Sequence, residues 1–174
     1  MKKNSLIRIN NLNLNSSRIG FYSLLKKHGA KIKFLKVSNK NIEKVGDIIV
    51  KSSKLKPINA SKNYYVSSTD EYPIMFVLAA LTPGISIFKG ITDLANKESN
   101  RIQEMKKILK KLGIRCITNK NEMKIYGKAK VKKNNKIIKV NPRGDHRIAM
   151  SSLILSLITG IPFVIKNFNT VYTS

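Results

Sequence analysis

Residues 70–101, DEYPIMFVLAALTPGISIFKGITDLANKESNR, predict a helix, a strand and the start of a second helix, with charged residues before each helix. Residues 74–81 are apolar on nearly every side, so the first helix should be buried rather than amphipathic. Asp70 is expected to cap it, with Pro73 in the first turn. Residues 85–89 are rich in β-branched and aromatic side chains and lie between two glycines, which predicts a strand.

The second helix is expected to begin near Lys97 and to end at Gly113. Apolar residues recur along it at helical spacing, with lysines on the other side. Glu98 and Arg101 are three positions apart, which would place them on one face of the first turn. A carboxylate and a guanidinium in that position can bind a ligand, or they can simply pair with each other.

The length of 174 residues allows one sizeable hydrophobic core, so we expect a single domain or part of a larger one. Cys116 is the only cysteine, and its apolar neighbours predict an inert core thiol; no disulfide framework exists within the chain. Residues 1–4 are basic like the start of a signal peptide, but no uninterrupted apolar run follows them. We therefore expect a cytoplasmic protein.

The net charge of +25 is the strongest compositional signal, and taken alone it suggests a nucleic-acid partner. However, 28 lysines, 24 isoleucines and 18 asparagines make up 70 of the 174 positions, and all three residue types have A/T-rich codons. The lysines are scattered, and no segment alternates aromatic with basic residues as a stacking surface would. Residues 128–136 are strongly basic and predict a solvated loop, with a phosphate patch as the alternative. We expect no nucleic-acid partner.

The first part of the chain predicts a strand at residues 6–14 and then a helix that is capped by Asn15 or Ser16 and ends at Gly29. His28, at the end of this helix, is expected to be a surface residue favoured by the helix dipole rather than a catalyst. After this helix we expect short strands at residues 32–35 and 47–51. Residues 52–68 are expected to be mostly polar loop, with a short strand at 64–66.

The second half predicts a hairpin of residues 114–118 and 123–126, then a strand at 137–140. Asp145 opens a third helix, residues 148–158, which ends at Gly160 before a strand at 162–166. The apolar run from 148 to 165 is about as long as a membrane span. Serines, a glycine and a proline divide it, so we expect a buried helix and a strand, and no membrane partner.

The two apolar helices belong to an internal repeat. Residues 70–89 and 145–166 both read acidic residue, apolar helix, glycine and strand, about 75 residues apart. The amphipathic helices also match, because Arg18 and Arg101 each begin a segment that ends in two lysines, a further residue and glycine. The chain therefore predicts two copies of a strand–helix–strand–strand–helix–strand unit, with a third begun near Phe168.

Four motifs in this chain resemble those of the 3-phosphoshikimate 1-carboxyvinyltransferase, or EPSP synthase, family, in the family's order and with close spacing. They are Asp70-Glu71-Tyr72-Pro73, Lys97-Glu98-Ser99-Asn100-Arg101, Gly144-Asp145-His146-Arg147-Ile148-Ala149-Met150 and the closing Thr173-Ser174. The resemblance covers nearly the whole chain. It implies an α/β fold of repeated βαβαββ units with buried helices, of which the third is incomplete here.

The resemblance further implies that residues 1–174 form most of the C-terminal domain of a two-domain enzyme with its active site between the domains. That enzyme transfers the enolpyruvyl group of phosphoenolpyruvate to the 5-hydroxyl of shikimate 3-phosphate, a step in chorismate and aromatic amino-acid biosynthesis. It uses neither metal nor organic cofactor. Because the partner domain is absent from this chain, we expect a separate N-terminal-domain polypeptide to be needed for activity.

The resemblance also implies a role for individual residues. Asp70 would accept a proton and contact the shikimate moiety, Lys97 would bind both substrates, and Glu98 would transfer a proton. Arg101 and Arg147 would clamp phosphoenolpyruvate, with His146 beside them. These residue types suit the chemistry, because arginine's planar fork matches carboxylate and phosphate and carboxylates can move the protons that the addition requires.

Simpler interpretations remain at this level: Asp70 and Asp145 as helix caps, and Glu98 with Arg101 as a surface pair. Asn100 also stands where the family commonly has aspartate, which would loosen support on the Arg101 side. The alternative functions are the related transferase that acts on UDP-N-acetylglucosamine, a non-catalytic fragment, and a basic nucleic-acid-binding module. The transferase that acts on UDP-N-acetylglucosamine lacks the Asp-His-Arg motif that this chain has at residues 145–147.

Overall fold

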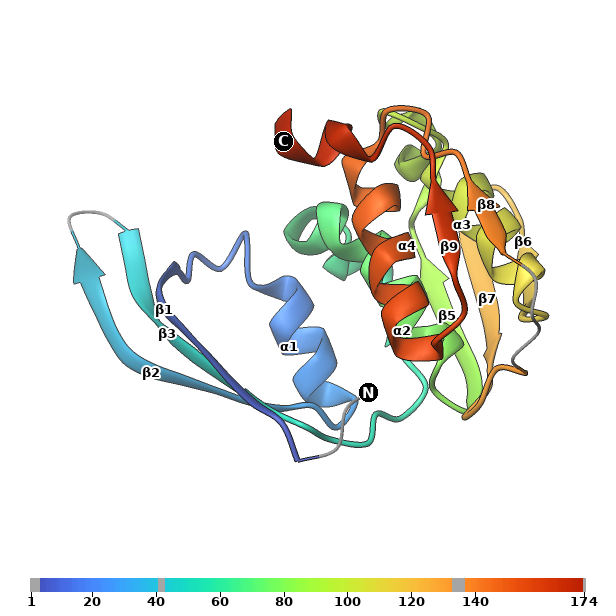
Figure 1. The fold of residues 1–174 in the computed structure, drawn as a ribbon. Helices are drawn as coiled ribbons and strands as arrows, with labels where there is room; N and C mark the ends of the chain where they lie inside the picture. The colour runs from blue at the N-terminus through green and yellow to red at the C-terminus, as the bar shows by residue number, and fades with distance from the viewer. Residues whose placement is uncertain (1–3, 41–42, 133–136, 174) are drawn as a thin grey trace.

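The computed structural model describes residues 4–40, 43–132 and 137–173, and its ribbon is shown in Figure 1. Strand β1 (Leu6–Asn13), helix α1 (Gly20–Lys27) and strands β2 (Lys31–Lys40) and β3 (Glu43–Lys51) form the first part of the fold. Strand β4 (Asn59–Ala60) and helix α2 (Tyr72–Ala80) follow. The second part comprises β5 (Gly84–Lys89), α3 (Arg101–Lys111), β6 (Arg115–Thr118), β7 (Glu122–Gly127), β8 (Ile138–Val140), α4 (His146–Thr159) and β9 (Phe163–Ile165).

The strand pairing repeats as the sequence pattern does. The first sheet has the order β1-β3-β2 and the second has β4-β5-β7-β6, so in each the third strand of the unit lies between the first and the second. These three strands are antiparallel in both sheets. Strand β4 pairs in parallel with β5, and β8 pairs in parallel with β9, so the last strand of one unit joins the first strand of the next. The third unit therefore begins at β9, a few residues before the predicted start near Phe168.

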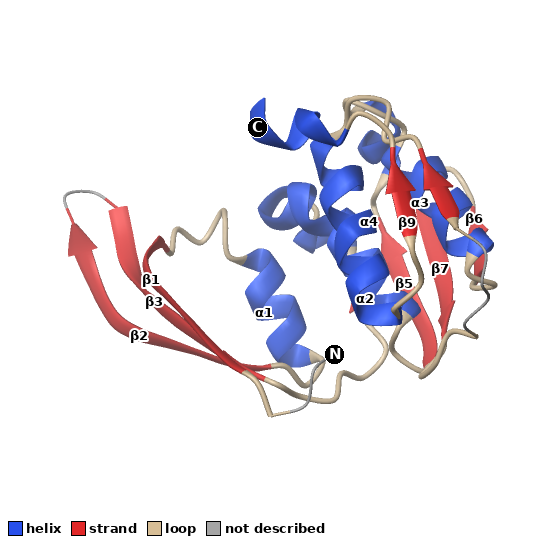
Figure 2. Ribbon diagram, in the orientation of Figure 1, coloured by secondary structure: helices blue, strands red, loops and turns tan. Residues whose placement is uncertain are grey.

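Helices α1, α2 and α4 lie between the β1-β3-β2 sheet and the remaining strands (Figures 1 and 2). Helix α2 packs against both α3 and α4. Its apolar character on all sides is matched by burial, because seven of its nine residues are buried. The rings of Tyr72, Phe76 and Phe88 meet edge to face in this core, and burial raises the pKa of the Tyr72 hydroxyl to about 12. The prediction that helix α2 is buried is therefore confirmed.

Helix α4 is only partly buried, and here the expectation of a buried helix is wrong for one side. Ile148, Ala149 and Leu155 lie in the core, together with two serines. The opposite side exposes an apolar stripe, with residues at the spacing of one helix face: Met150, Leu153, Ile154, Leu157 and Ile158. Since α4 is apolar on all sides, its sequence alone does not tell which side the fold covers.

Two local expectations are also wrong. Residues 64–66 form no strand, because the short strand is β4 and the chain then turns through 3₁₀-helices at Lys62–Tyr64 and Val66–Glu71. Helix α1 begins after Ile19 and has no side-chain cap; the Asn15 side chain instead accepts hydrogen bonds from the backbone N–H and hydroxyl of Ser17. The expected strands at 32–35 and 47–51 are confirmed and extend into the longer β2 and β3, which pair with a register shift between Leu35 and Ser38.

His28 is buried, which contradicts the prediction of a surface residue. Its Nδ1 lies 2.8 Å from the carbonyl oxygen of Leu24, and its Nε2 lies 3.0 Å from the backbone nitrogen of Asn59. A ring protonated on Nδ1 and not on Nε2 satisfies both contacts. His28 thus joins the end of α1 to β4.

Other expectations hold in the described part of the chain. The hairpin of β6 and β7 is confirmed, and residues 128–132 form a loop; residues 133–136 of the basic segment lie outside the described residues. Cys116 lies at the edge of the core rather than within it, because its side chain is only partly buried, and this burial raises the pKa of its thiol to about 11. Within residues 4–40, 43–132 and 137–173, no helix has the length and apolar character to cross a membrane.

Candidate functional site

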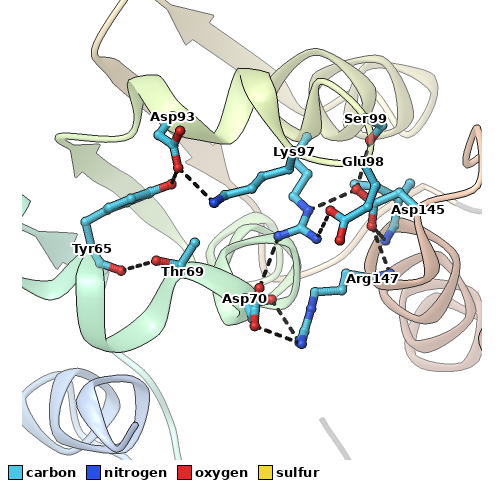
Figure 3. A network of polar contacts seen from close by, with 11 residues as sticks. Tyr65, Thr69, Asp70, Asp93, Lys97, Glu98, Ser99, Asp145 and Arg147 are labelled. Atoms are coloured by element: carbon cyan, nitrogen blue, oxygen red, sulfur yellow. Dashed lines mark hydrogen bonds and ion pairs between the residues drawn. The ribbon is translucent and has the colours of Figure 1, made fainter. Parts of the chain in front are cut away.

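The charged residues singled out in the sequence meet where α2, α3 and α4 begin (Figure 3). Asp70 lies in the 3₁₀-helix Val66–Glu71 that leads into α2, Arg101 is the first residue of α3, and Arg147 is the second residue of α4. Three helix N-termini carry partial positive charge, which favours anions. Asp70, Glu98, Arg101 and Arg147, to which the resemblance assigned roles, are in contact with one another through Arg101 and Asp70.

Arg101 is the centre of this cluster and is only 1% exposed. Its Nε donates to Asp145 at 2.9 Å, its Nη2 to Glu98 at 2.6 Å and its Nη1 to Asp70 at 3.4 Å. Burial by itself would lower the pKa of the guanidinium, but the hydrogen bond and charge of Asp145, helped by Glu98 and Asp70, raise it. Arg101 is therefore a permanent, fixed cation in a cluster of carboxylates.

Asp145 connects α3 to α4. One carboxylate oxygen accepts from the backbone nitrogens of Arg147 (3.0 Å) and Ile148 (3.4 Å), so Asp145 is the N-cap of α4. The other accepts from Arg101 Nε and from the hydroxyl of Ser99 at 3.0 Å. Because Asp145 is fully buried, its capping role and its ion pair both work without competition from water. The interpretation as a simple cap was thus incomplete.

Arg147 reaches across to the end of the 3₁₀-helix. Its Nη2 lies 3.0 Å from the Asp70 carboxylate, and its Nη1 donates to the backbone carbonyl of Asp70 at 3.4 Å. The Asp70 carboxylate therefore contacts Arg101 with one oxygen and Arg147 with the other. His146 precedes Arg147 as the first residue of α4 and is partly exposed.

Lys97 belongs to a neighbouring polar chain. Its Nζ lies 2.8 Å from Asp93, and the same carboxylate oxygen accepts from the hydroxyl of Tyr65 at 2.8 Å. The hydrogen bonds of Lys97 and Tyr65 lower the pKa of Asp93, while burial and the bond to Asp93 raise the pKa of Tyr65. The structure thus places Lys97 beside the arginine cluster (Figure 3), with its ammonium paired to Asp93, which in turn accepts from Tyr65; the sequence pattern had pointed to neither residue.

Two details of the expected helix starts are wrong. Helix α3 begins at Arg101 rather than near Lys97, because Asn100 is its N-cap and accepts from the backbone nitrogen of Gln103 at 3.0 Å. Glu98 therefore precedes the helix and reaches Arg101 from outside the first turn. Asp70 does not cap α2, since the residue at the N-cap position is Glu71 and its side chain makes no capping bond. The Asp70 carboxylate instead pairs with Arg101 and Arg147.

A polar pocket of about 440 Å³ opens beside this cluster. Lys97 and Asp70 line it together with Ser17, Arg18 and residues 66–71. Glu71 is half-buried there, and its burial raises the pKa of its carboxyl. Arg18 was seen in the sequence only as a repeat marker, and the match between its segment and that of Arg101 was the one signal that could have pointed to it.

No candidate metal site exists among the residues that the structure describes, because no group of three or more histidine, cysteine, aspartate and glutamate side chains could hold an ion there. The carboxylates that gather at this site face cations of the protein itself: Arg101 and Arg147. Each of these arginines is paired with at least one carboxylate of the protein.

A family model described as EPSP synthase (3-phosphoshikimate 1-carboxyvinyltransferase) matches residues 1–174. Relatives named 3-phosphoshikimate 1-carboxyvinyltransferase include one from Petrotoga mobilis, 38% identical over 99% of this chain and 39% of its own length. Another, from Clostridium tetani, is 37% identical over 97% of this chain and 38% of its own length. The chain therefore spans about 40% of the length of the curated relatives it matches.

Solved structures agree with this. The EPSP synthase from Acinetobacter baumannii superposes with a TM-score of 0.90 at 31% identity, covering 99% of this chain and 40% of that one. The enolpyruvyl transferase NikO from Streptomyces tendae gives 0.66 at 14% identity over 96% of this chain and 35% of its own, a likeness of fold alone. The α/β fold of enolpyruvyl-transferase type predicted from the sequence is confirmed.

Proposed function

We propose, from the premise that the chain belongs to the EPSP synthase family, that it is the part of such an enzyme that binds phosphoenolpyruvate and moves protons during enolpyruvyl transfer. The acceptor is the 5-hydroxyl of shikimate 3-phosphate, and phosphate is released. Residues 1–174 are then most of the C-terminal domain of a two-domain transferase.

The observation that carries this proposal is the convergence of two arginines and two carboxylates. Arg101 and Arg147 come from different helices and lie on the two oxygens of one carboxylate, Asp70. Two guanidinium groups so placed match the carboxylate and phosphate of phosphoenolpyruvate. The N-termini of α3 and α4 add to the attraction for anions.

The protons are assigned to Asp70 and Glu98. The attacking hydroxyl must lose a proton as the new C–O bond forms, and the methylene carbon of phosphoenolpyruvate must gain one. The methyl group so formed must then lose a proton as the C–O bond to phosphate breaks, which releases phosphate and restores the double bond. Asp70, with a side chain 40% exposed, is assigned the proton of the hydroxyl, and Glu98, 51% exposed, is assigned the proton for the methylene carbon. Lys97 lines the adjacent pocket and is assigned contact with both substrates. His146, next to Arg147 in the chain, is assigned to the edge of the arginine pair.

Catalysis needs further polypeptide, which we propose to be an N-terminal-domain chain. The support is twofold: the relatives are about two and a half times as long as this chain, and α4 exposes an apolar stripe in which Leu157 is 69% exposed. Such a stripe is typical of a surface that another segment covers. The cytoplasmic location expected from the sequence stays a prediction.

The test is phosphate release from phosphoenolpyruvate and shikimate 3-phosphate. The purified chain alone should release no phosphate above background, and adding the N-terminal polypeptide of a relative such as that of Petrotoga mobilis should restore turnover. In that mixture Arg147→Ala should lower kcat/KM by about 100-fold or more, because it removes a guanidinium from the developing charge.

The matched control is Arg143→Ala, because Arg143 is an exposed arginine four residues earlier that pairs with Glu104. It should keep turnover within about 2-fold of the unsubstituted chain. Equal losses for the two substitutions would contradict the assignment of Arg147, and fast turnover by the 174-residue chain alone would contradict the need for a second polypeptide.

A further inference from the structure

We propose that Asp70 is an internal competitor for the anion site: its carboxylate holds the position between Arg101 and Arg147 that a substrate carboxylate needs, and the substrate must displace it. This inference rests on the proposed function, since it concerns the same two arginines. It adds a second role to Asp70, which sets the apparent affinity for phosphoenolpyruvate and couples it to binding of the acceptor.

The geometry of Asp70 is that of a bound carboxylate. Its Oδ1 lies 3.4 Å from Arg101 Nη1 and its Oδ2 lies 3.0 Å from Arg147 Nη2, so each oxygen faces a different guanidinium. The two arginines come from the starts of α3 and α4, and Asp70 comes from the segment before α2. A carboxylate from solution that bridged the two arginines would use the same donors.

The contacts of the arginines differ in how easily they can be released. Arg101 is 1% exposed and keeps Asp145 on Nε and Glu98 on Nη2 when Asp70 leaves, so its position does not depend on Asp70. The Arg147 and Asp70 side chains are 30% and 40% exposed, so their ion pair is reached by solvent and exchanges readily. Displacing Asp70 therefore frees Arg147 Nη2 and Arg101 Nη1 and leaves the rest of the cluster in place.

The exchange also explains why one residue can serve both substrates. In this structure both Asp70 oxygens face guanidinium groups. When Asp70 turns away from the arginines, it becomes available to the hydroxyl and the arginines become available to the anion. Acceptor and phosphoenolpyruvate should therefore favour each other's binding through this single side chain.

The test is calorimetric titration of the chain with phosphoenolpyruvate. If Asp70 occupies the site about nine-tenths of the time, it weakens the apparent affinity about 10-fold. Asp70→Asn and Asp70→Ala should then each bind phosphoenolpyruvate about 10-fold more tightly than the unsubstituted chain. Circular dichroism melting of each variant checks that it folds, and two variants protect the test against the failure of one.

Two further variants separate the possible causes. Glu104→Gln also removes one negative charge, from a residue one turn after Arg101 in α3. The Glu104 side chain pairs with Lys107 and Arg143 rather than with the two site arginines, so this variant should leave the affinity for phosphoenolpyruvate almost unchanged. Arg147→Ala should weaken binding. If Arg147→Ala weakens binding and the Asp70 variants do not strengthen it, the competitor role is overturned and the proposed function stands. If Arg147→Ala has no effect either, the arginine site itself is wrong and both proposals fall.

Discussion

The carboxylate of Asp145 lies 2.9 Å from Nε of Arg101, and both side chains are almost completely removed from solvent although they are 44 positions apart in the chain. Removing one member of a buried ion pair leaves the other charge uncompensated. We therefore expect Asp145→Asn to lower the free energy of unfolding by about 3 kcal/mol, measured by urea denaturation at neutral pH.

This substitution isolates the ion pair from the helix cap, because asparagine caps helices as well as aspartate does. Ser99→Ala is the matched control: it removes one hydrogen bond to the same Asp145 oxygen and keeps the charge, so it should cost about 1 kcal/mol. A loss for Asp145→Asn no larger than that for Ser99→Ala would show that the pair contributes little.

His28 should be required for the junction between α1 and β4. In His28→Ala the part-buried backbone N–H of Asn59 loses its acceptor, and the buried carbonyl of Leu24 loses one of its donors. An unsatisfied buried polar group costs about 1–3 kcal/mol, so the midpoint of urea unfolding should fall accordingly. The comparison is Lys27→Ala at the neighbouring exposed position, whose effect should be within about 0.5 kcal/mol of zero.

The error over His28 shows where sequence reasoning stops. A histidine before a helix-ending glycine has the same local pattern whether its ring faces water or a strand that comes 31 residues later. The repeat, by contrast, was readable because glycines, apolar runs and charged helix starts recur at one period, and the strand pairing then follows the same period. Local patterns predicted the elements, and long-range contacts decided which faces are covered.

The same distinction applies to the site. The motifs predicted that Asp70, Glu98, Arg101 and Arg147 gather, and their contacts confirm it. The motifs did not predict that Asp70 would bridge both arginines, because this depends on the relative placement of three helices. Tyr65 and Asp93 were missed for a related reason: each is an ordinary polar residue in its own segment, and only the fold brings them to Lys97.

Gly127 should be the least replaceable glycine among those that end a strand or a helix. A Cβ there would lie 1.9 Å from the carbonyl oxygen of Thr82 and 2.1 Å from that of Ala79, both backbone atoms at the end of α2. Because backbone cannot move aside as a flexible side chain can, Gly127→Ala should destabilise the chain by about 3 kcal/mol or more in urea unfolding.

Gly113→Ala is the control for this prediction. Gly113 has a φ of +70° and no atom within 4 Å of its would-be Cβ, so alanine there meets only the cost of the left-handed backbone, about 1 kcal/mol. If the two alanine variants were equally stable, β7 could not lie as close to the end of α2 as the structure places it.

Asp47 should make the chain less stable in acid. It accepts from Arg8 at 2.6 Å and from the backbone nitrogen of Asn11 at 3.0 Å, and these bonds lower its pKa below the usual 3.8. A carboxylate with a lowered folded-state pKa stabilises the fold above its unfolded pKa, and this stability is lost as the pH falls through the folded-state value. The free energy of unfolding, measured in urea from about pH 7 down to about pH 2, should therefore fall as the pH falls, and it should fall less in Asp47→Asn.

Arg8→Gln separates the two causes of that shift. It removes the larger one, the hydrogen bond from Arg8, and leaves the Asn11 N–H in place. The loss of unfolding free energy in acid should therefore be smaller than in the unsubstituted chain and larger than in Asp47→Asn. At neutral pH both variants should already be less stable than the unsubstituted chain, because the ionised Asp47 has lost a partner or has been removed. An Asp47→Asn curve parallel to that of the unsubstituted chain throughout the acid range would mean that the contacts of Asp47 do not differ between the folded and unfolded states, contrary to the bridge from β3 to β1 that the Arg8 side chain makes.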